Sequence, residues 1–72
     1  MSSRNYLGRR LAALREKGGL SQRQLADRAG VSQAFVSLVE GGGRELSRPY
    51  AMALADALGV SVDELQRKEK KS

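Results

Sequence analysis

Glycines followed closely by a serine recur at short intervals along this chain, and this pattern restricts it to a series of short helices. Each glycine break is soon followed by a serine: Gly18 and Gly19 by Ser21, Gly30 by Ser32, Gly41, Gly42 and Gly43 by Ser47, and Gly59 by Ser61. Glycine readily adopts the left-handed backbone that ends a helix, and an N-cap serine accepts a hydrogen bond from a free N–H of the next helix. The pattern therefore predicts five helices, the third of them over residues 32–40.

The spacing of the apolar residues also favours helices. One-sided apolar patterns recur in three segments: Leu7, Leu11 and Leu14; Leu25, Ala26 and Ala29; and Ala51, Leu54, Ala55 and Leu58. Capping-box pairs occur at Ser21 with Gln24 and at Ser61 with Glu64, and Pro49 is tolerated in the first turn after Ser47. The β-branched residues are isolated, which argues against strands. We expect an all-α domain over residues 1–66, followed by a charged, disordered tail over residues 67–72.

The composition excludes several classes of function. The 72 residues include no cysteine and no histidine, so disulfides, thiol chemistry and most zinc sites are ruled out. We find no nucleophile–base pair and no phosphate-binding glycine loop before a helix, and we expect no metal, no cofactor and no enzymatic activity. The chain contains no bilayer-length apolar run, so we expect a cytoplasmic, nucleoid-associated protein without a membrane partner. The net charge of +5 favours a polyanionic partner, although a solvated basic surface explains it as well.

The most informative segment runs from Ser21 to Glu40, where a tight turn at Gly30 separates two short helices. Two helices joined in this way cross steeply and expose the second as a convex edge that fits the major groove of B-DNA. A helical wheel places Ser32, Val36, Val39 and Glu40 on the core side of the second helix and Gln33, Ala34, Ser37 and Leu38 on the outer side. This outer side is nearly uncharged, which suits a surface that loses its water against base edges.

This segment and its surroundings resemble the Cro/cI-type helix-turn-helix family, also called the XRE or lambda-repressor-like family. The resemblance covers roughly residues 6–66 and is carried by Leu14-Arg15, Leu20-Ser21-Gln22, Leu25-Ala26, Ala29-Gly30-Val31-Ser32, Val36-Ser37, Val39-Glu40, Ala57-Leu58-Gly59-Val60-Ser61 and Asp63-Glu64-Leu65. It implies a five-helix fold and a transcriptional regulator or antitoxin that binds operator DNA. Members often act as dimers, but the short fifth helix makes a monomer equally plausible here.

The outer side of the third helix supplies the expected base contacts. Gln33 can donate to and accept from the N6/N7 edge of adenine, although it could also be an exposed glutamine without a role. Ser32 and Ser37 can hydrogen-bond a base edge or a phosphate, and Ser32 can serve as an N-cap alone or in addition. Ala34 and Leu38 can contact thymine methyl groups, with packing against a neighbouring helix as the alternative for Leu38. We expect Phe35 to pack as a wedge against the second helix.

Phosphate contacts are expected from four residues: Gln22, Arg44 and, with lower rank, Arg23 and Arg48. For Gln22 the resemblance implies both a phosphate contact and support of the recognition helix, and the free N–H groups at that helix end also favour an anion. The resemblance further pairs Arg15 with Glu40, a structural role, because a lone buried charge would be costly. Three other basic residues are explained equally well as phosphate contacts or as a solvated face: Arg4, Arg9 and Arg10.

Three features depart from the family pattern. The glycine run at residues 41–43 predicts a flexible loop that lacks one phosphate-contacting side chain, and Glu45 would repel the DNA backbone. The recognition face has no Arg or Lys, so we expect an A·T-leaning site. The competing hypothesis is a protein-interaction domain, adaptor or antitoxin-like, whose Ala34 and Leu38 face seats a partner helix. The regular capping is also compatible with an engineered DNA-binding module.

Overall fold

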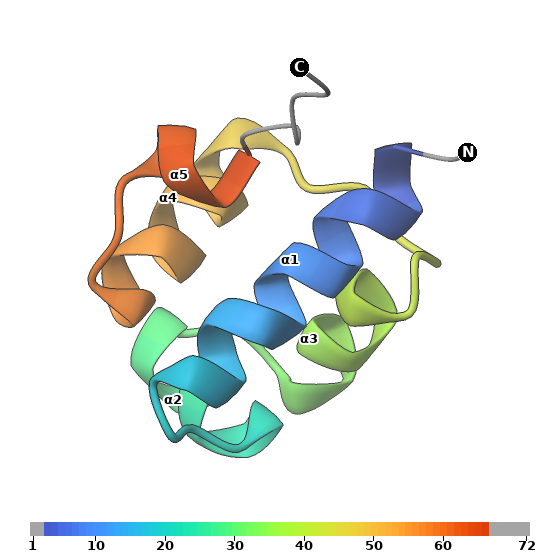
Figure 1. Cartoon of the computed structure of the whole chain (residues 1–72). Coiled ribbons are helices and arrows are strands. Elements are labelled where there is room, and N and C mark those ends of the chain that lie inside the picture. Colours follow the sequence, from blue (N-terminus) through green and yellow to red (C-terminus); the bar gives the residue numbers. More distant parts are fainter. Residues whose placement is uncertain (1–2, 67–72) are drawn as a thin grey trace.

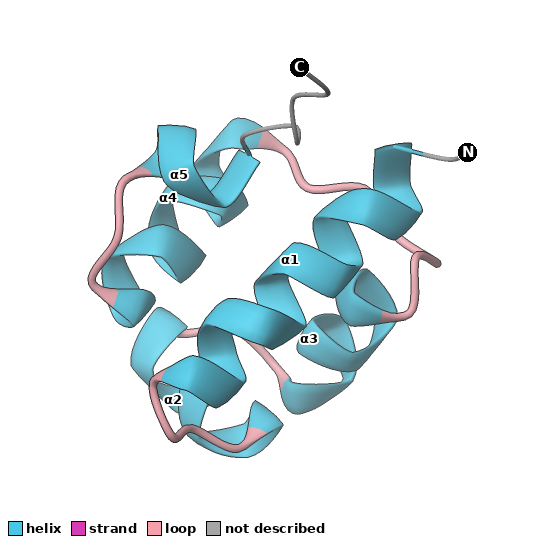
Figure 2. Cartoon of the chain, in the orientation of Figure 1, coloured by secondary structure: helices cyan, strands magenta, loops and turns pink. Residues whose placement is uncertain are grey.

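The computed structural model describes residues 3–66, which form five α-helices and, within that range, no strand. The helices are α1 (Ser3–Lys17), α2 (Gln22–Ala29), α3 (Gln33–Glu40), α4 (Arg48–Leu58) and α5 (Val62–Gln66). Figure 1 shows α1 running diagonally across the molecule, with α3 packed along it and α4 and α5 on the other side. Figure 2 shows that only short loops join the helices. The all-α, five-helix prediction is confirmed. The predicted tail over residues 67–72 lies outside the described residues.

The predicted caps at the starts of α2, α3 and α5 are present. The Ser21 hydroxyl accepts from the Gln24 N–H at 3.0 Å, and the Gln24 side chain accepts in return from the Ser21 N–H at 2.8 Å. The Ser32 hydroxyl accepts from the Phe35 N–H, and the Ser61 hydroxyl from the Glu64 N–H, each at 3.0 Å. These bonds satisfy helix N–H groups that no helical carbonyl can reach.

The predicted cap at Ser47 needs correction. Ser47 does occupy the N-cap position of α4 with extended backbone, but its side chain makes no capping hydrogen bond. A capping hydroxyl normally accepts from the N–H two or three residues further on. Pro49 occupies the first of these two positions and has no N–H, so half of the usual donors are missing.

Two glycines shape the ends of the helix-turn-helix. Gly30 ends α2 with a φ of 75°, a left-handed conformation that strains any residue with a side chain. After α3, Gly42 has a φ of 81°, and the N–H groups of Gly42 and Gly43 donate to the carbonyls of Val39 and Leu38 at 3.1 and 2.9 Å. This pair of bonds is a Schellman motif. The glycine run, which we expected to be an irregular flexible loop, thus begins as a hydrogen-bonded helix end.

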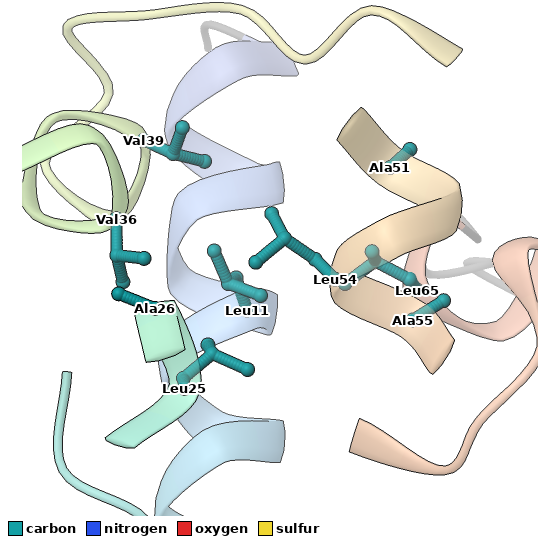
Figure 3. Close-up of a cluster of buried hydrophobic side chains, with 9 residues drawn as sticks. All are labelled: Leu11, Leu25, Ala26, Val36, Val39, Ala51, Leu54, Ala55 and Leu65. Atoms are coloured by element: carbon teal, nitrogen blue, oxygen red, sulfur yellow. The ribbon is translucent and has the colours of Figure 1, made fainter. Parts of the chain in front are cut away.

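A single apolar core joins the helices (Figure 3). Nine side chains are at most 1% exposed: Leu11, Leu25, Ala26, Val36, Val39, Ala51, Leu54, Ala55 and Leu65. In Figure 3, Leu11 of α1 lies between the side chains of α2 and α3 on one side and those of α4 on the other. The expected core positions Leu7, Leu14, Ala29 and Leu58 are partly buried and pack around this cluster. Helix α3 is therefore firmly seated through Val36 and Val39.

Helix α1 makes two close contacts that fix its neighbours. Gly8 is buried against the end of α3, where an added Cβ would lie 2.4 Å from the Val39 carbonyl oxygen. Arg10 donates from Nε to the Glu64 carbonyl of α5 at 2.9 Å. Arg10, for which the sequence allows either a phosphate contact or a solvated side chain, therefore joins α1 to α5. Within residues 3–66, no helix has the length and apolar character needed to cross a membrane.

Candidate nucleic-acid interface

Helix α3 presents one buried and one exposed side, as the helical wheel predicts. Val36 and Val39 are fully buried, whereas Gln33, Ala34 and Ser37 are exposed and Leu38 is 51% exposed. The exposed fraction of Leu38 argues against its alternative reading as a residue packed between helices. The four exposed side chains, Gln33, Ala34, Ser37 and Leu38, form one uncharged surface, which we call the recognition face.

Of two neighbours of the recognition face, one departs from the sequence prediction and the other has a contact that the sequence did not indicate. Ser32 is exposed and not on the core side, because as the N-cap it has extended backbone (φ −80°, ψ 154°) and lies outside the helical wheel. Phe35 is half-buried, and the ring contact that the structure records is with Tyr50 of α4, at 4.8 Å between ring centroids. Phe35 also packs against the buried core to which Leu25 and Ala26 of α2 belong, so the Tyr50 contact joins α3 to α4 in addition to the expected packing.

A hydrogen-bonded network behind the recognition face joins three helices. Arg15 of α1 donates to both carboxylate oxygens of Glu40, from Nε at 2.7 Å and from Nη2 at 3.2 Å. Gln22 of α2 donates from Nε2 to Glu40 Oε1 at 3.0 Å. Arg15 also donates from Nη1 to the Leu20 carbonyl at 2.8 Å. Arg15 and Glu40 thus form the expected structural pair, and Gln22 supports α3 through its carboxyl-terminal residue.

The network stabilises the charged form of Arg15. The Glu40 carboxylate raises the pKa of Arg15 above its ordinary value through their hydrogen bonds, and this outweighs the opposing effect of burial. The side chains of Arg15 and Glu40 are only 12% and 9% exposed. Charge-assisted, bidentate bonds of this kind are stronger and more directional than neutral ones. The pair therefore fixes the position of α3 relative to α1.

The residues expected to meet phosphates lie on three segments. Gln22 is at the start of α2, and one of its two amide N–H groups is available beyond the bond to Glu40. Arg44 follows the Schellman motif, with its guanidinium carbon 5.1 Å from the centre of the Phe35 ring. Arg23 and Arg48 are exposed near the starts of α2 and α4. Two of these four residues contact α3 directly: Gln22 through Glu40 and Arg44 through Phe35.

Sequence reasoning missed the roles of three residues that hold the helices in place. Gly8 allows α1 to approach the end of α3, Tyr50 supports Phe35, and Arg10 holds α5. Only Gly8 left a signal in the sequence, because glycine inside a helix is destabilising by roughly 0.5–1 kcal/mol relative to alanine and calls for a packing reason. Among residues 3–66, no group of three or more acidic residues is arranged to hold a metal ion.

Comparison with known proteins agrees with this geometry. Residues 6–67 match the family model described as a helix-turn-helix domain, and the chain belongs to this family, in its Cro/cI-type form. It is 40% identical over 65 residues to the uncharacterized HTH-type transcriptional regulator y4dJ of Sinorhizobium fredii, covering 90% of the chain and 84% of that protein. It is also 36% identical over 69 residues to the propionyl-CoA carboxylase regulator of Cereibacter sphaeroides. That match spans 96% of this chain but 15% of the regulator.

Solved structures share the fold closely. The restriction-modification controller protein C.AhdI from Aeromonas hydrophila superposes with a TM-score of 0.84 at 39% identity, over 86% of this chain and 94% of that one. The P22 c2 repressor, solved in complex with a synthetic operator, gives a TM-score of 0.80 at 32% identity, over 88% and 96% of the two chains. These relatives are transcriptional regulators, not enzymes, and the fold is lambda-repressor-like.

Proposed function

We propose that residues 1–66 form a DNA-binding unit that recognises a specific duplex sequence by placing α3 in the major groove. The observation that carries this proposal is the recognition face, which is exposed, uncharged and held on a helix that the core and the Arg15–Glu40 pair seat firmly. Such a face can lose its water against base edges at little electrostatic cost. In this role the chain is a transcriptional regulator that acts inside the cell, at the nucleoid.

Each side chain of the recognition face has a distinct role in this proposal. Gln33 reads adenine through paired hydrogen bonds to N6 and N7. Ser37, together with Ser32 at the cap, donates to a base edge or to a phosphate. Ala34 and Leu38 contact thymine methyl groups. Because the recognition face has no Arg or Lys for bidentate contact with guanine, the proposal favours an A·T-leaning site.

Phosphate contacts from both sides of α3 hold it in register. Gln22 uses its remaining amide N–H at the start of α2, where free backbone N–H groups also favour an anion. Arg44 donates from the loop after α3, with Arg23 and Arg48 as further contributors. The carboxylate of Glu45 lies next to Arg44 in sequence and opposes this attraction. These contacts supply affinity, whereas the recognition face supplies sequence discrimination.

Selection from a pool of random duplexes, followed by sequencing, tests the proposal. We expect enrichment of one short A·T-leaning site. A monomer would select a single half-site, and a homodimer would select two half-sites related by two-fold symmetry, so the same experiment measures the number of bound copies. A pool that stays random after repeated rounds would contradict sequence-specific binding.

Gln33→Ala should relax sequence preference without abolishing binding. Removing one bidentate interaction with a base should reduce discrimination at a single base pair by about 1–3 kcal/mol. Competition binding between the selected duplex and single-base variants measures this effect. Gln66→Ala, an exposed glutamine on α5, is the matched control and should leave every preference unchanged. If Gln33→Ala retained the full preference, Gln33 would not read a base.

Binding should weaken steeply as salt concentration rises. Phosphate contacts release condensed counterions, and about four to six neutralised phosphates predict a log–log slope of roughly −4 to −5. Fluorescence anisotropy across a series of salt concentrations gives the slope directly. Replacing a phosphate-binding arginine with alanine should make the slope shallower by about one unit for each arginine replaced. A slope near zero would exclude binding through the phosphate backbone.

The exposed apolar part of the recognition face favours one alternative, a protein-interaction domain that seats a partner helix. Leu38 is 51% exposed, and Ala34 lies one turn before it on the same side of α3. Titration with duplex DNA, monitored through the backbone amide signals of α3, separates the two functions. Shifts concentrated at residues 33–38 support DNA binding. Signals that stay unchanged with duplex DNA but move on addition of an amphipathic helix would support the alternative.

A further inference from the structure

Arg44 lies over the Phe35 ring, one member of an aromatic pair that joins α3 to α4. Its guanidinium carbon is 5.1 Å from the centre of the Phe35 ring, and that ring lies 4.8 Å from the ring of Tyr50, with the two planes tilted by 40°. The three side chains, which we call the Arg44 stack, come from the loop after α3, from α3 itself and from the first turn of α4. Figure 1 shows this loop leaving α3 and crossing to α4.

The geometry of the stack leaves Arg44 able to bind an anion. Arginine carries five N–H donors, and in the described part of the chain those of Arg44 make no hydrogen bond or ion pair besides the contact with the ring. Arg15 provides the contrast within the same chain, because its N–H donors bond to the Glu40 carboxylate and the Leu20 carbonyl. The aromatic contact therefore positions Arg44 without occupying the donors that a phosphate would need.

The stack also restricts a side chain that its surroundings would otherwise leave free. Arg44 is exposed and follows three consecutive glycines, which have no side chains to pack around it. Arginine loses considerable rotamer freedom when a ligand immobilises it, and a side chain that is already held loses less. Phe35, supported by Tyr50, thus restricts the Arg44 side chain where the three preceding glycines offer no side chain to do so.

We propose that Phe35 and Tyr50 are positioning residues that hold Arg44 for contact with a backbone phosphate of DNA. This inference rests on the proposed function and names a mechanism within it. Because Phe35 is on the same helix as Gln33, the stack couples the position of the phosphate contact to the position of α3 in the groove. A substitution of the Phe35 ring then changes DNA affinity through Arg44 and not through a direct contact between the ring and DNA.

A double-mutant cycle between Phe35→Leu and Arg44→Ala tests the coupling. Affinity is measured by anisotropy with a labelled duplex of fixed sequence, about 20 base pairs long, at low salt where phosphate contacts dominate. Phe35→Leu alone should weaken binding by about two- to five-fold, as expected for an exposed cation–π contact. In the Arg44→Ala background, Phe35→Leu should cause no further weakening. A purely structural role would give effects that multiply.

Two controls keep the test decisive. Tyr50 is 43% exposed, so Tyr50→Leu should fold and show the same dependence on Arg44 even if Phe35→Leu does not fold. In an Arg48→Ala background, Phe35→Leu should retain its full effect. Multiplying effects of Phe35→Leu and Arg44→Ala, or an unchanged affinity of Arg44→Ala, would overturn the inference and leave sequence-specific binding by the recognition face intact. A wild-type chain that binds no duplex would overturn both.

Discussion

Glu40→Ala should remove a large share of the free energy that keeps the protein folded. The Glu40 carboxylate accepts from Arg15 of α1 and from Gln22 of α2, and its removal leaves a guanidinium that is only 12% exposed without its main partner. Breaking one half of a buried pair costs about 3–5 kcal/mol. A domain of this size has a total stability of only about 3–10 kcal/mol. Urea unfolding followed by circular dichroism measures the decrease.

Two variants separate this effect from the general loss of charge. Glu16 also approaches Arg15, at 3.6 Å, but its side chain is 70% exposed, so Glu16→Ala should change stability by no more than about 0.5 kcal/mol. The double variant Arg15→Met/Glu40→Leu removes both charges and should recover much of the stability, because apolar replacements of buried pairs are often neutral or better. Equal decreases in Glu40→Ala and Glu16→Ala would show that the pair is not a structural link.

Gly8→Ala should destabilise the protein, although alanine is the better helix former. The added Cβ would lie 2.4 Å from the carbonyl oxygen of Val39 and 2.5 Å from that of Glu40, distances that require backbone movement. Forcing a methyl group into such a contact costs about 1–3 kcal/mol. The shift would move the end of α3 away from α1, so DNA affinity should fall along with the unfolding temperature.

Gly18→Ala, at the position just after α1, provides the matched control. A Cβ there would lie 3.6 Å from its nearest neighbours, which is an ordinary contact distance. Removing a glycine where the backbone tolerates a side chain should stabilise the protein by about 0.4–1 kcal/mol. The two substitutions should therefore change the thermal midpoint in opposite directions. A rise in both midpoints would refute the close approach of α1 to α3.

Features that depend on neighbouring residues were predictable from the sequence. The Ser21 and Gln24 capping box and the left-handed turn at Gly30 each involve residues within a few positions of one another, and both are present. The wheel that separates Val36 and Val39 from the outer side of α3 depends only on helical period, and the burial agrees with it. The roles of the recognition face and of the phosphate contacts remain predictions.

Features that depend on packing between distant segments were not predictable in this way. Phe35 also contacts Tyr50, fifteen positions further along the chain, a contact that the sequence did not indicate. Two local expectations also needed correction, for local reasons: Pro49 lacks an N–H that the Ser47 cap could use, and the glycine run donates back to Val39 and Leu38 as a helix end. The Arg15–Glu40 pair was expected through a family resemblance and not from the spacing of the two residues.

The order of helices, their ends and the side that each helix buries follow from the residues of this chain. These properties arise from hydrogen bonds and apolar spacing over three or four positions, where the covalent chain itself keeps the partners close. The approach of Gly8 to α3, the ring beneath Arg44 and the bond from Gln22 to Glu40 follow from the assembled fold. Their partners are separated by up to about thirty positions, and the shared core of all five helices brings them together.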